Sequence, residues 1–181
     1  LWRFDLTRKT DQVFRHDPAD ATSLGSNGVT SILRSRTGDL WVGTYGGGLN
    51  RMMPDTPGFS RYQFNASTPD SIHSDRVMAL FEDRDGRLWI GTDLGLSWYD
   101  NATDSIQRLE HVVPISTGDT TMSGRTNAAG LEGQSIWSIA EDSRGNLSIG
   151  TGSGGLYMWP SIDRDDGLVR FSAMGDRLTL P

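Results

Sequence analysis

The residue types that carry catalysis or bind metals are sparse in this chain and widely spaced. Its three histidines, His16, His73 and His111, stand far apart at predicted strand ends or loops, at no spacing that suits a metal site. There is no cysteine, which excludes thiolate zinc sites, disulfides and cysteine nucleophiles. Nucleophile elbows and strand-to-helix phosphate loops are also missing from the sequence. We therefore expect no metal, no cofactor and no catalytic residue in this segment.

Carboxylates are the one abundant reactive group, with 23 aspartates and glutamates in all. A pair of carboxylates on either side of a glycosidic bond is the machinery of sugar hydrolysis. Glu110, Glu132 or one of the many aspartates could supply such a pair. Most of the aspartates, however, stand at turn positions of a repeated motif, where the turn itself favours them. A polysaccharide lyase or glycosidase built on the same fold is the alternative to a non-enzymatic function.

The repeated motif consists of a turn glycine, a polar residue, a short apolar run and then Gly-Thr. It occurs three times, at residues 38–44, 86–92 and 145–151, with its first glycines 48 and 59 residues apart. Nine residues before each of these glycines a further apolar run begins, at Val29, Val77 and Ile136. The third unit carries 11 extra residues. Self-similarity at this period is the signature of a repeat architecture.

The first complete unit contains four apolar runs, which predict strands at residues 29–34, 40–44, 49–53 and 59–64, joined by turns that mostly contain glycine. Four short antiparallel strands per period are typical of a β-propeller blade. The predicted fold is therefore all-β, a propeller fragment of about three and a half blades. The predicted units are a partial blade at 1–28 and complete blades at 29–75, at 76–135 with an insertion at 111–134, and at 136–181.

The centre of the motif is apolar on both faces of its strand, as in Leu88-Trp89-Ile90. A half-exposed strand would alternate apolar and polar residues, whereas a blade strand is covered on both sides by neighbouring blades. We therefore predict that Trp89 fills the wedge between two blades. Ser148 stands at the tryptophan position of the third copy, so that copy departs from the pattern.

The chain carries a net charge of −6. Nucleic acids and anionic membranes select a basic face, so neither is expected to be a partner. No apolar run reaches the length of a membrane span. Three and a half blades do not close a ring, and closure is what removes exposed sheet edges. We expect either the remaining blades of the same propeller or self-association to cover the open faces.

The stretch from Val77 to Leu96 resembles the two-component regulator propeller repeat, and residues 23–29 resemble the link that leads into each blade of this family. The resemblance covers nearly the whole chain. It implies the periplasmic sensor region of an inner-membrane signalling protein, either a hybrid histidine kinase, often of a carbohydrate-responsive system, or a diguanylate cyclase. The implied partner is a carbohydrate or another small ligand.

A binding site would lie among long loops on one face of a rigid scaffold. If the first strand of each unit is innermost, the loops that enter the blades share a face with the turns between second and third strands. On this face we predict five ligand-binding residues: Tyr45, Arg76, Asp93, Arg125 and Asn127. The alternatives are that these side chains only cap the blades and that the chain is an interaction scaffold without a ligand.

Overall fold

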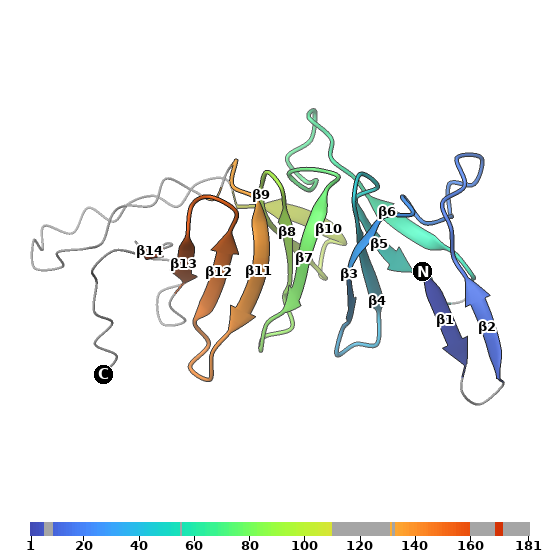
Figure 1. Cartoon of the computed structure of the whole chain (residues 1–181), viewed down its shortest axis with the longest axis horizontal. Helices are drawn as coiled ribbons and strands as arrows, with labels where there is room; N and C mark the ends of the chain where they lie inside the picture. Colours follow the sequence, from blue (N-terminus) through green and yellow to red (C-terminus); the bar gives the residue numbers. More distant parts are fainter. Residues whose placement is uncertain (6–8, 55, 110–130, 132, 160–168, 172–181) are drawn as a thin grey trace, which may run out of the picture.

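The computed structural model describes residues 1–5, 9–54, 56–109, 131, 133–159 and 169–171 (Figure 1). Within these ranges the regular secondary structure is entirely β. The strands are β1 (Trp2–Asp5), β2 (Thr10–Val13), β3 (Val29–Arg34), β4 (Leu40–Thr44), β5 (Leu49–Met52), β6 (Phe59–Tyr62), β7 (Val77–Glu82), β8 (Leu88–Thr92), β9 (Gly95–Asp100), β10 (Ser105–Arg108), β11 (Ile136–Glu141), β12 (Leu147–Thr151), β13 (Leu156–Trp159) and β14 (Val169–Phe171).

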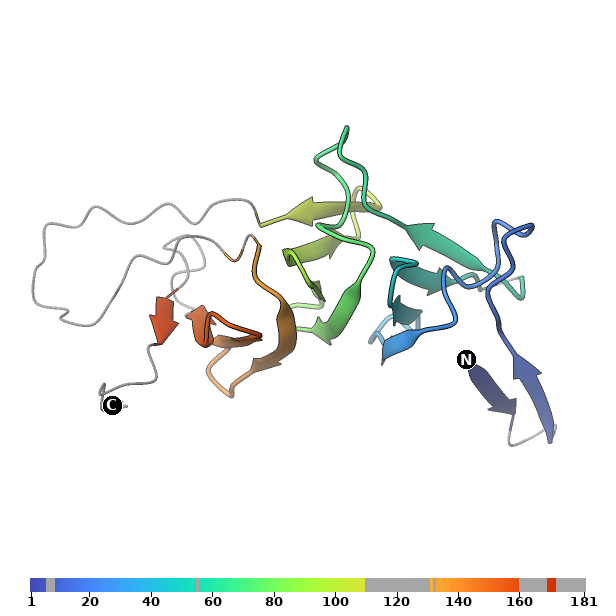
Figure 2. The ribbon, with the colours of Figure 1, turned by 45° about the horizontal axis from the view of Figure 1, so that its top comes forward.

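These strands form three antiparallel four-stranded sheets in chain order, β3 to β6, β7 to β10 and β11 to β14, and a separate hairpin of β1 and β2. The sheets stand side by side like blades in two views of the ribbon (Figures 1 and 2). The predicted all-β propeller fragment is confirmed. Two strands of the first blade are shorter than predicted: β5 ends before Met53, whose N–H closes a turn onto Gly58, and β6 ends before Phe64, whose N–H binds the Asp75 carboxylate.

The first strands of the three blades, β3, β7 and β11, lie next to one another. Each contains the same β-bulge after its first residue, between Val29 and Ser31, Val77 and Ala79, and Ile136 and Ser138. The tight turns between first and second strands therefore share one edge of the molecule. The turns between second and third strands lie at the opposite edge with the loop that enters the second blade (Figure 1). We call this second edge the loop face.

The glycines and threonines of the motif fix its turns. Gly86 adopts a φ of 81°, a left-handed conformation that costs glycine little. Gly91 has no room for a side chain, because a Cβ there would lie 2.7 Å from Ile136 in the next blade. The motif threonines Thr44, Thr92 and Thr151 donate their hydroxyl protons to the carbonyls of Gly48, Gly95 and Gly155 at 2.9, 3.0 and 2.9 Å.

The hydrophobic core lies between the blades. One buried cluster fills the wedge between the first and second complete blades, a second fills the wedge between the second and third, and a smaller one lies between the β1–β2 hairpin and the first. In each large wedge a tryptophan on a second strand meets an aromatic ring on the third strand of the next blade. Trp41 lies 4.7 Å from Tyr99 and Trp89 lies 5.6 Å from Trp159, measured between ring centroids.

Trp89 is also anchored by a polar contact. It is fully buried, and its indole N–H donates to Oδ2 of the buried Asp83 at 2.9 Å. The other carboxylate oxygen of Asp83 accepts the backbone N–H groups of Asp85 and Arg87 in the adjoining tight turn. Because a buried carboxylate must be hydrogen-bonded to be tolerated, the indole and the turn support each other. The predicted packing role of Trp89 is confirmed.

We predict that Trp89→Ala lowers the free energy of unfolding by roughly 3–5 kcal/mol, because it removes a fully buried ring and one donor to Asp83. Trp137→Ala is the matched control, since that indole is 59% exposed and lies outside the wedges. The control should cost about 1 kcal/mol or less. Urea denaturation followed by far-UV circular dichroism measures both, and equal losses for the two variants would contradict the wedge assignment.

Candidate functional site

Three of the five predicted binding residues lie together on the loop face. Tyr45 follows β4, Arg76 precedes β7 and Asp93 follows β8, and Tyr45 pairs with Arg76 in an isolated antiparallel bridge. The Arg76 guanidinium carbon lies 5.0 Å from the centroid of the Tyr45 ring, and its Nη1 lies 3.3 Å from Oδ2 of Asp93. The guanidinium group therefore contacts both an aromatic ring of one blade and a carboxylate of the next. We call these three residues the loop-face cluster.

Backbone hydrogen bonds within and between blades hold the cluster in place. The N–H of Tyr45 donates to Gly28 O at 2.7 Å and the N–H of Asp93 donates to Arg76 O at 3.2 Å. These bonds connect the residue after each motif threonine to the residue before the first strand of its own blade. The N–H groups of Gly46 and Gly48 both donate to Asp75 O at 2.9 Å, so the turn of the first blade is fixed to the loop entering the second. The side chains are left free to project from a fixed backbone.

The cluster is accessible, and it contains an acceptor without a donor. Tyr45 is 52% exposed, and the side chains of Arg76 and Asp93 are 53% and 23% exposed. Oδ1 of Asp93 is buried and has no hydrogen-bond partner among the residues that the structure describes. An unpaired buried carboxylate oxygen is costly. A flat ring and a guanidinium donor beside a partly exposed carboxylate together suit a small ligand with several hydroxyl groups.

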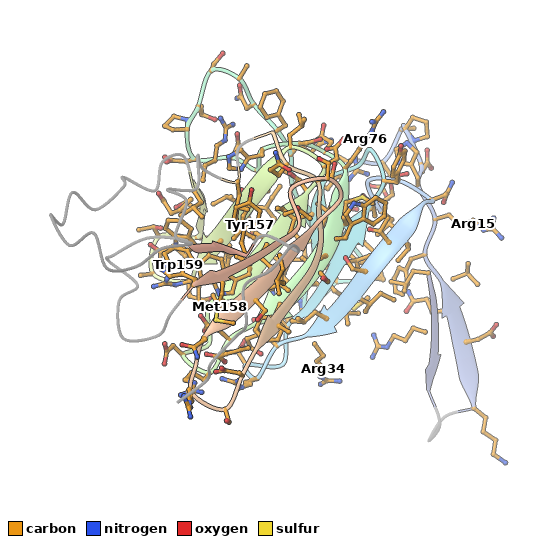
Figure 3. All side chains as sticks on the ribbon, turned by 60° about the vertical axis from the view of Figure 1, so that its left-hand side comes forward. Arg15, Arg34, Arg76, Tyr157, Met158 and Trp159 are labelled. Carbon is orange, nitrogen blue, oxygen red and sulfur yellow. The ribbon has the colours of Figure 1, made fainter. Side chains whose placement is uncertain are left out.

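Figure 3 shows Arg76 at one edge of the blades and Arg34 at the other, which places the loop-face cluster away from the tight turns. Arg125 and Asn127, the other two predicted binding residues, lie outside the described residues.

Trp137 is a loop-face aromatic that the sequence did not single out. Its indole lies against the turn after β12, because a Cβ added to Gly152 would be 2.6 Å from Trp137 Nε1. From the sequence pattern, Trp137 would be expected to be an ordinary strand residue that faces a neighbouring blade. It is in fact the extra residue of the bulge between Ile136 and Ser138, which takes it out of the strand's alternation. Recurrence of the bulge in all three blades is visible only in the strand register.

A second polar cluster, which we call the interblade clasp, joins the first and second blades. Arg51 on β5 donates to Oδ1 of Asp39 through Nε and Nη2, each at 3.0 Å, and to the Tyr99 hydroxyl through Nη1 at 3.0 Å. Oδ1 of Asp104 then accepts the hydroxyl protons of Tyr99 and Tyr62 at 2.5 and 2.8 Å. The Arg51 guanidinium also stacks over Trp41 at 5.3 Å.

The pKa shifts of the clasp follow from these contacts. Burial, assisted by the hydrogen bond to Asp104, raises the pKa values of Tyr99 and Tyr62 above the ordinary tyrosine value. The hydrogen bonds from Tyr99 and Tyr62, with Arg51 nearby, lower the pKa of Asp104. Both hydroxyls and the guanidinium are engaged within the clasp. We assign it to joining blades rather than to binding a ligand.

The histidines have local structural roles where the structure describes them. Nδ1 of His16 lies 2.8 Å from Leu24 O, and Nδ1 of His73 lies 2.9 Å from Ser97 Oγ. His111 lies outside the described residues. In the described part of the chain, no three residues of the types His, Cys, Asp and Glu are grouped so that they could hold a metal ion. The described ranges also contain no helix with the length and apolar character of a membrane span.

Two segments match a known repeat family. Residues 23–46 and 71–93 match the model described as two component regulator propeller. These two segments resemble two-component regulator propeller repeats. Each matched segment covers the end of an entry loop and the start of a blade, and together they include Tyr45, Arg76 and Asp93. A search of curated protein sequences found no match.

Solved structures share this fold. The extracellular domain of BT4673 from B. thetaiotaomicron, assigned to a one-component system, is 25% identical with a TM-score of 0.66 over 93% of this chain. A second structure of that protein, assigned to a hybrid two-component system, is 25% identical with a TM-score of 0.61 over 87% of this chain. The chain spans only 19% and 18% of these two structures.

PorZ, a surface component of the type-IX secretion system of Porphyromonas gingivalis, is 20% identical with a TM-score of 0.58 over 87% of this chain and 22% of its own. At this identity the likeness concerns the fold alone. The propeller described above therefore resembles the extracellular regions of two-component systems, and the same fold also occurs in a protein of another kind.

The interblade clasp predicts a loss of stability in acid. Because the pKa of Asp104 is lowered in the folded chain, its ionised form stabilises the fold at pH values above the ordinary aspartate pKa of about 4, and this contribution disappears as the pH falls through the lowered value. Asp104→Asn should flatten the stability profile below about pH 4. Asp70→Asn, at an exposed loop position, is the control and should leave the profile unchanged. Urea midpoints across the range test this, and identical profiles for wild type and Asp104→Asn would contradict it.

Proposed function

We propose that this chain is a non-enzymatic segment of the periplasmic sensor propeller of a bacterial signal-transduction receptor, and that it binds a carbohydrate or a similar small polar ligand on its loop face. The observation that carries the proposal is the loop-face cluster. Tyr45, Arg76 and Asp93 combine an exposed ring, a guanidinium group and an unpaired acceptor on a backbone fixed by interblade hydrogen bonds. Polar groups that converge beside an aromatic surface are the usual composition of a small-ligand site.

The comparisons support a sensor role. The repeat family and the two BT4673 structures connect this fold to extracellular domains of signalling systems. In such a receptor the ligand is outside the membrane and the catalytic output domain is inside, so the propeller has to bind the ligand and need not convert it. We infer a histidine kinase or a diguanylate cyclase as the output of the full receptor.

The position of the cluster suits signalling. Tyr45 belongs to the first complete blade, whereas Arg76 and Asp93 belong to the second. A ligand that contacts all three therefore bridges two blades across their wedge. If the two blades can adopt two relative orientations, the ligand stabilises the orientation that it binds more tightly. The free energy of this stabilisation is set by the difference between its affinities for the two orientations.

Recognition fits the cluster better than sugar hydrolysis does. A glycosidase needs two carboxylates placed around one bond, one of which gives up a proton. The carboxylate of the cluster is ion-paired with Arg76, which favours a hydrogen-bond acceptor. We therefore keep the non-enzymatic assignment.

The proposal is tested by ligand screening with the 181-residue chain. Thermal shift across a panel of neutral and acidic oligosaccharides should identify at least one stabilising sugar, and isothermal titration should then give its affinity. Tyr45→Ala and Arg76→Ala should each weaken this binding more than about tenfold, as expected of central contacts. A panel in which no sugar stabilises the chain would favour the scaffold interpretation.

Phe64→Ala is the matched control for that titration. Phe64 is also an exposed ring under a guanidinium group, with Arg108 5.2 Å from its centroid, but it follows β6 at the outer side of the first blade. Its replacement should leave the affinity within twofold of wild type. An equal loss at Phe64 would show that general surface aromaticity, and not the loop-face cluster, holds the sugar.

A further inference from the structure

One apolar face of the first complete blade lacks a cover at its inner half. Ile32 on β3 is 54% exposed. Leu80 on β7 and Ile139 on β11 occupy the same position in the next two blades, and both are partly buried in a wedge against the preceding blade. The difference arises because only the β1–β2 hairpin lies against the first blade, and the small cluster that it forms there does not include Ile32.

The β1–β2 hairpin has the geometry of the outer half of a blade. Its register, with Asp5 opposite Thr10, repeats that of β9 and β10, where Asp100 lies opposite Ser105. Four residues separate the strands in both hairpins, and the last of each four, Lys9 and Asp104, has a positive φ, at 53° and 51°. These are the two non-glycine residues with positive φ in the described ranges. The free edge of β1 therefore corresponds to the edge of β9 that pairs with β8.

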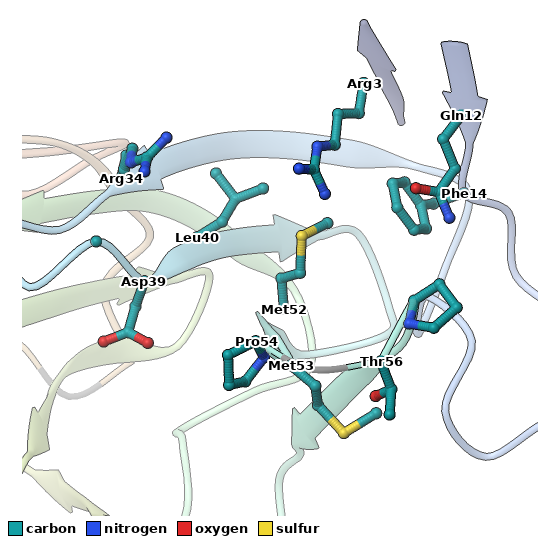
Figure 4. A pocket seen from close by; sticks show the side chains of 12 residues that line it. Arg3, Gln12, Phe14, Arg34, Asp39, Leu40, Met52, Met53, Pro54 and Thr56 are labelled. Atoms are coloured by element: carbon teal, nitrogen blue, oxygen red, sulfur yellow. The ribbon is translucent and has the colours of Figure 1, made fainter. Parts of the chain in front are cut away.

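A cleft of about 490 Å³ lies between this hairpin and the first complete blade (Figure 4). Leu40 and Met52 form its apolar wall, with Phe14 at the hairpin side. Met52 stands at the position of Tyr99 and Trp159, the rings that receive a tryptophan from the preceding blade in the other two wedges. The cleft thus has the place of an interblade wedge and, at Leu40 and Met52, an apolar wall like that of one.

At the end of the cleft nearest the tight turn, the last residue of the first strand has the opposite charge to its equivalents in the other wedges. Glu82 accepts the backbone N–H of Arg36 in the preceding blade at 2.9 Å, and Glu141 accepts that of Arg84 at 2.8 Å. The equivalent residue of the first blade is Arg34, which lines the cleft together with Arg3. Neither arginine forms an ion pair with a residue that the structure describes. Whatever fills the cleft must supply an acceptor where the other wedges supply a donor.

The far face of the third blade is a poor match for this cleft. Its second strand carries Ser148 where Trp41 and Trp89 fill the other wedges, and its tight turn carries Ser143 where Arg36 and Arg84 meet glutamates. A second copy of the chain docked head to tail would bring Ser143, which has no carboxylate, to Arg34 and would leave Met52 without an aromatic ring.

We propose that this cleft, together with the exposed Ile32, seats a separate β-hairpin of the same repeat type, and not a second copy of this chain. The second strand of this hairpin pairs with the free edge of β1 and places a large aromatic ring against Met52. Its turn carries an acidic residue, which meets Arg34 at the position that Arg36 and Arg84 occupy in the other wedges. The three tight turns of the present chain carry Arg36, Arg84 and Ser143 at this position, and none of these residues is acidic.

The test uses hairpin peptides and the complete 181-residue chain. The parent peptide has the sequence of Val77 to Thr92, and its Arg84→Glu form carries the acidic turn. Fluorescence anisotropy should show that the acidic peptide binds about fivefold more tightly than the parent at low salt. The order should reverse when the chain carries Arg34→Glu. A Trp89→Ser peptide should bind more than tenfold more weakly than either. Equal affinities of parent and acidic peptides for both chains would overturn the proposal.

Two variants of the chain show where the peptide binds and test whether a second copy of the chain occupies the cleft instead. Ile32→Asp should abolish peptide binding, whereas Leu156→Asp, at an exposed apolar position of the third blade, should leave it unchanged. Circular dichroism confirms that both variants fold. Sedimentation velocity supports the proposal if the chain does not assemble through the cleft. A head-to-tail assembly that both variants dissolve would make a second copy the occupant and overturn the proposal.

Discussion

The structure depends on ring packing between neighbouring sheets. No blade has an interior of its own, because each is a single layer whose apolar side chains point into the wedges on its two sides. Trp41 and Trp89 each cross a wedge to reach an aromatic ring of the following blade. Their burial supplies much of the apolar area removed from water, which is the main favourable term in folding. The hairpins and turns position these rings.

The polar contacts are subordinate to this packing and are repeated with it. Each motif threonine closes the turn that follows the second strand, and the neighbouring backbone N–H groups attach that turn to the entry loop. At the opposite edge, glutamates at the ends of β7 and β11 accept backbone donors from the preceding blade. The loop-face cluster uses the first set of contacts as its support, so its side chains are placed by the repeat even though their residue types differ from copy to copy.

Much of this could be predicted from the sequence, since a repeat reveals its own period. The recurrence of Gly-Thr after an apolar run predicted the strands, and the two-sided apolar run at Trp89 predicted its burial between blades. Tyr45, Arg76 and Asp93 could be assigned to one face from topology alone. Trp137 could not, because a bulge changes the direction of a side chain without a mark in the residue types. The interblade clasp was also missed, since Arg51, Tyr62 and Asp104 come together only when two blades fold against each other. The exposure of Ile32 depends likewise on which neighbour is present.

Because no blade has a hydrophobic core of its own, the order in which the blades unfold depends on their neighbours. Stability in such an array is a nearest-neighbour quantity, in which each unit contributes little alone and each interface contributes much. The blade of β7 to β10 is covered on both faces, whereas its two neighbours are each covered by a complete blade on one face only. In an isolated stretch of these 181 residues, local unfolding should therefore begin at the two outer blades and move inward. The strands of the blade of β7 to β10 would be the last to exchange their amide protons with solvent.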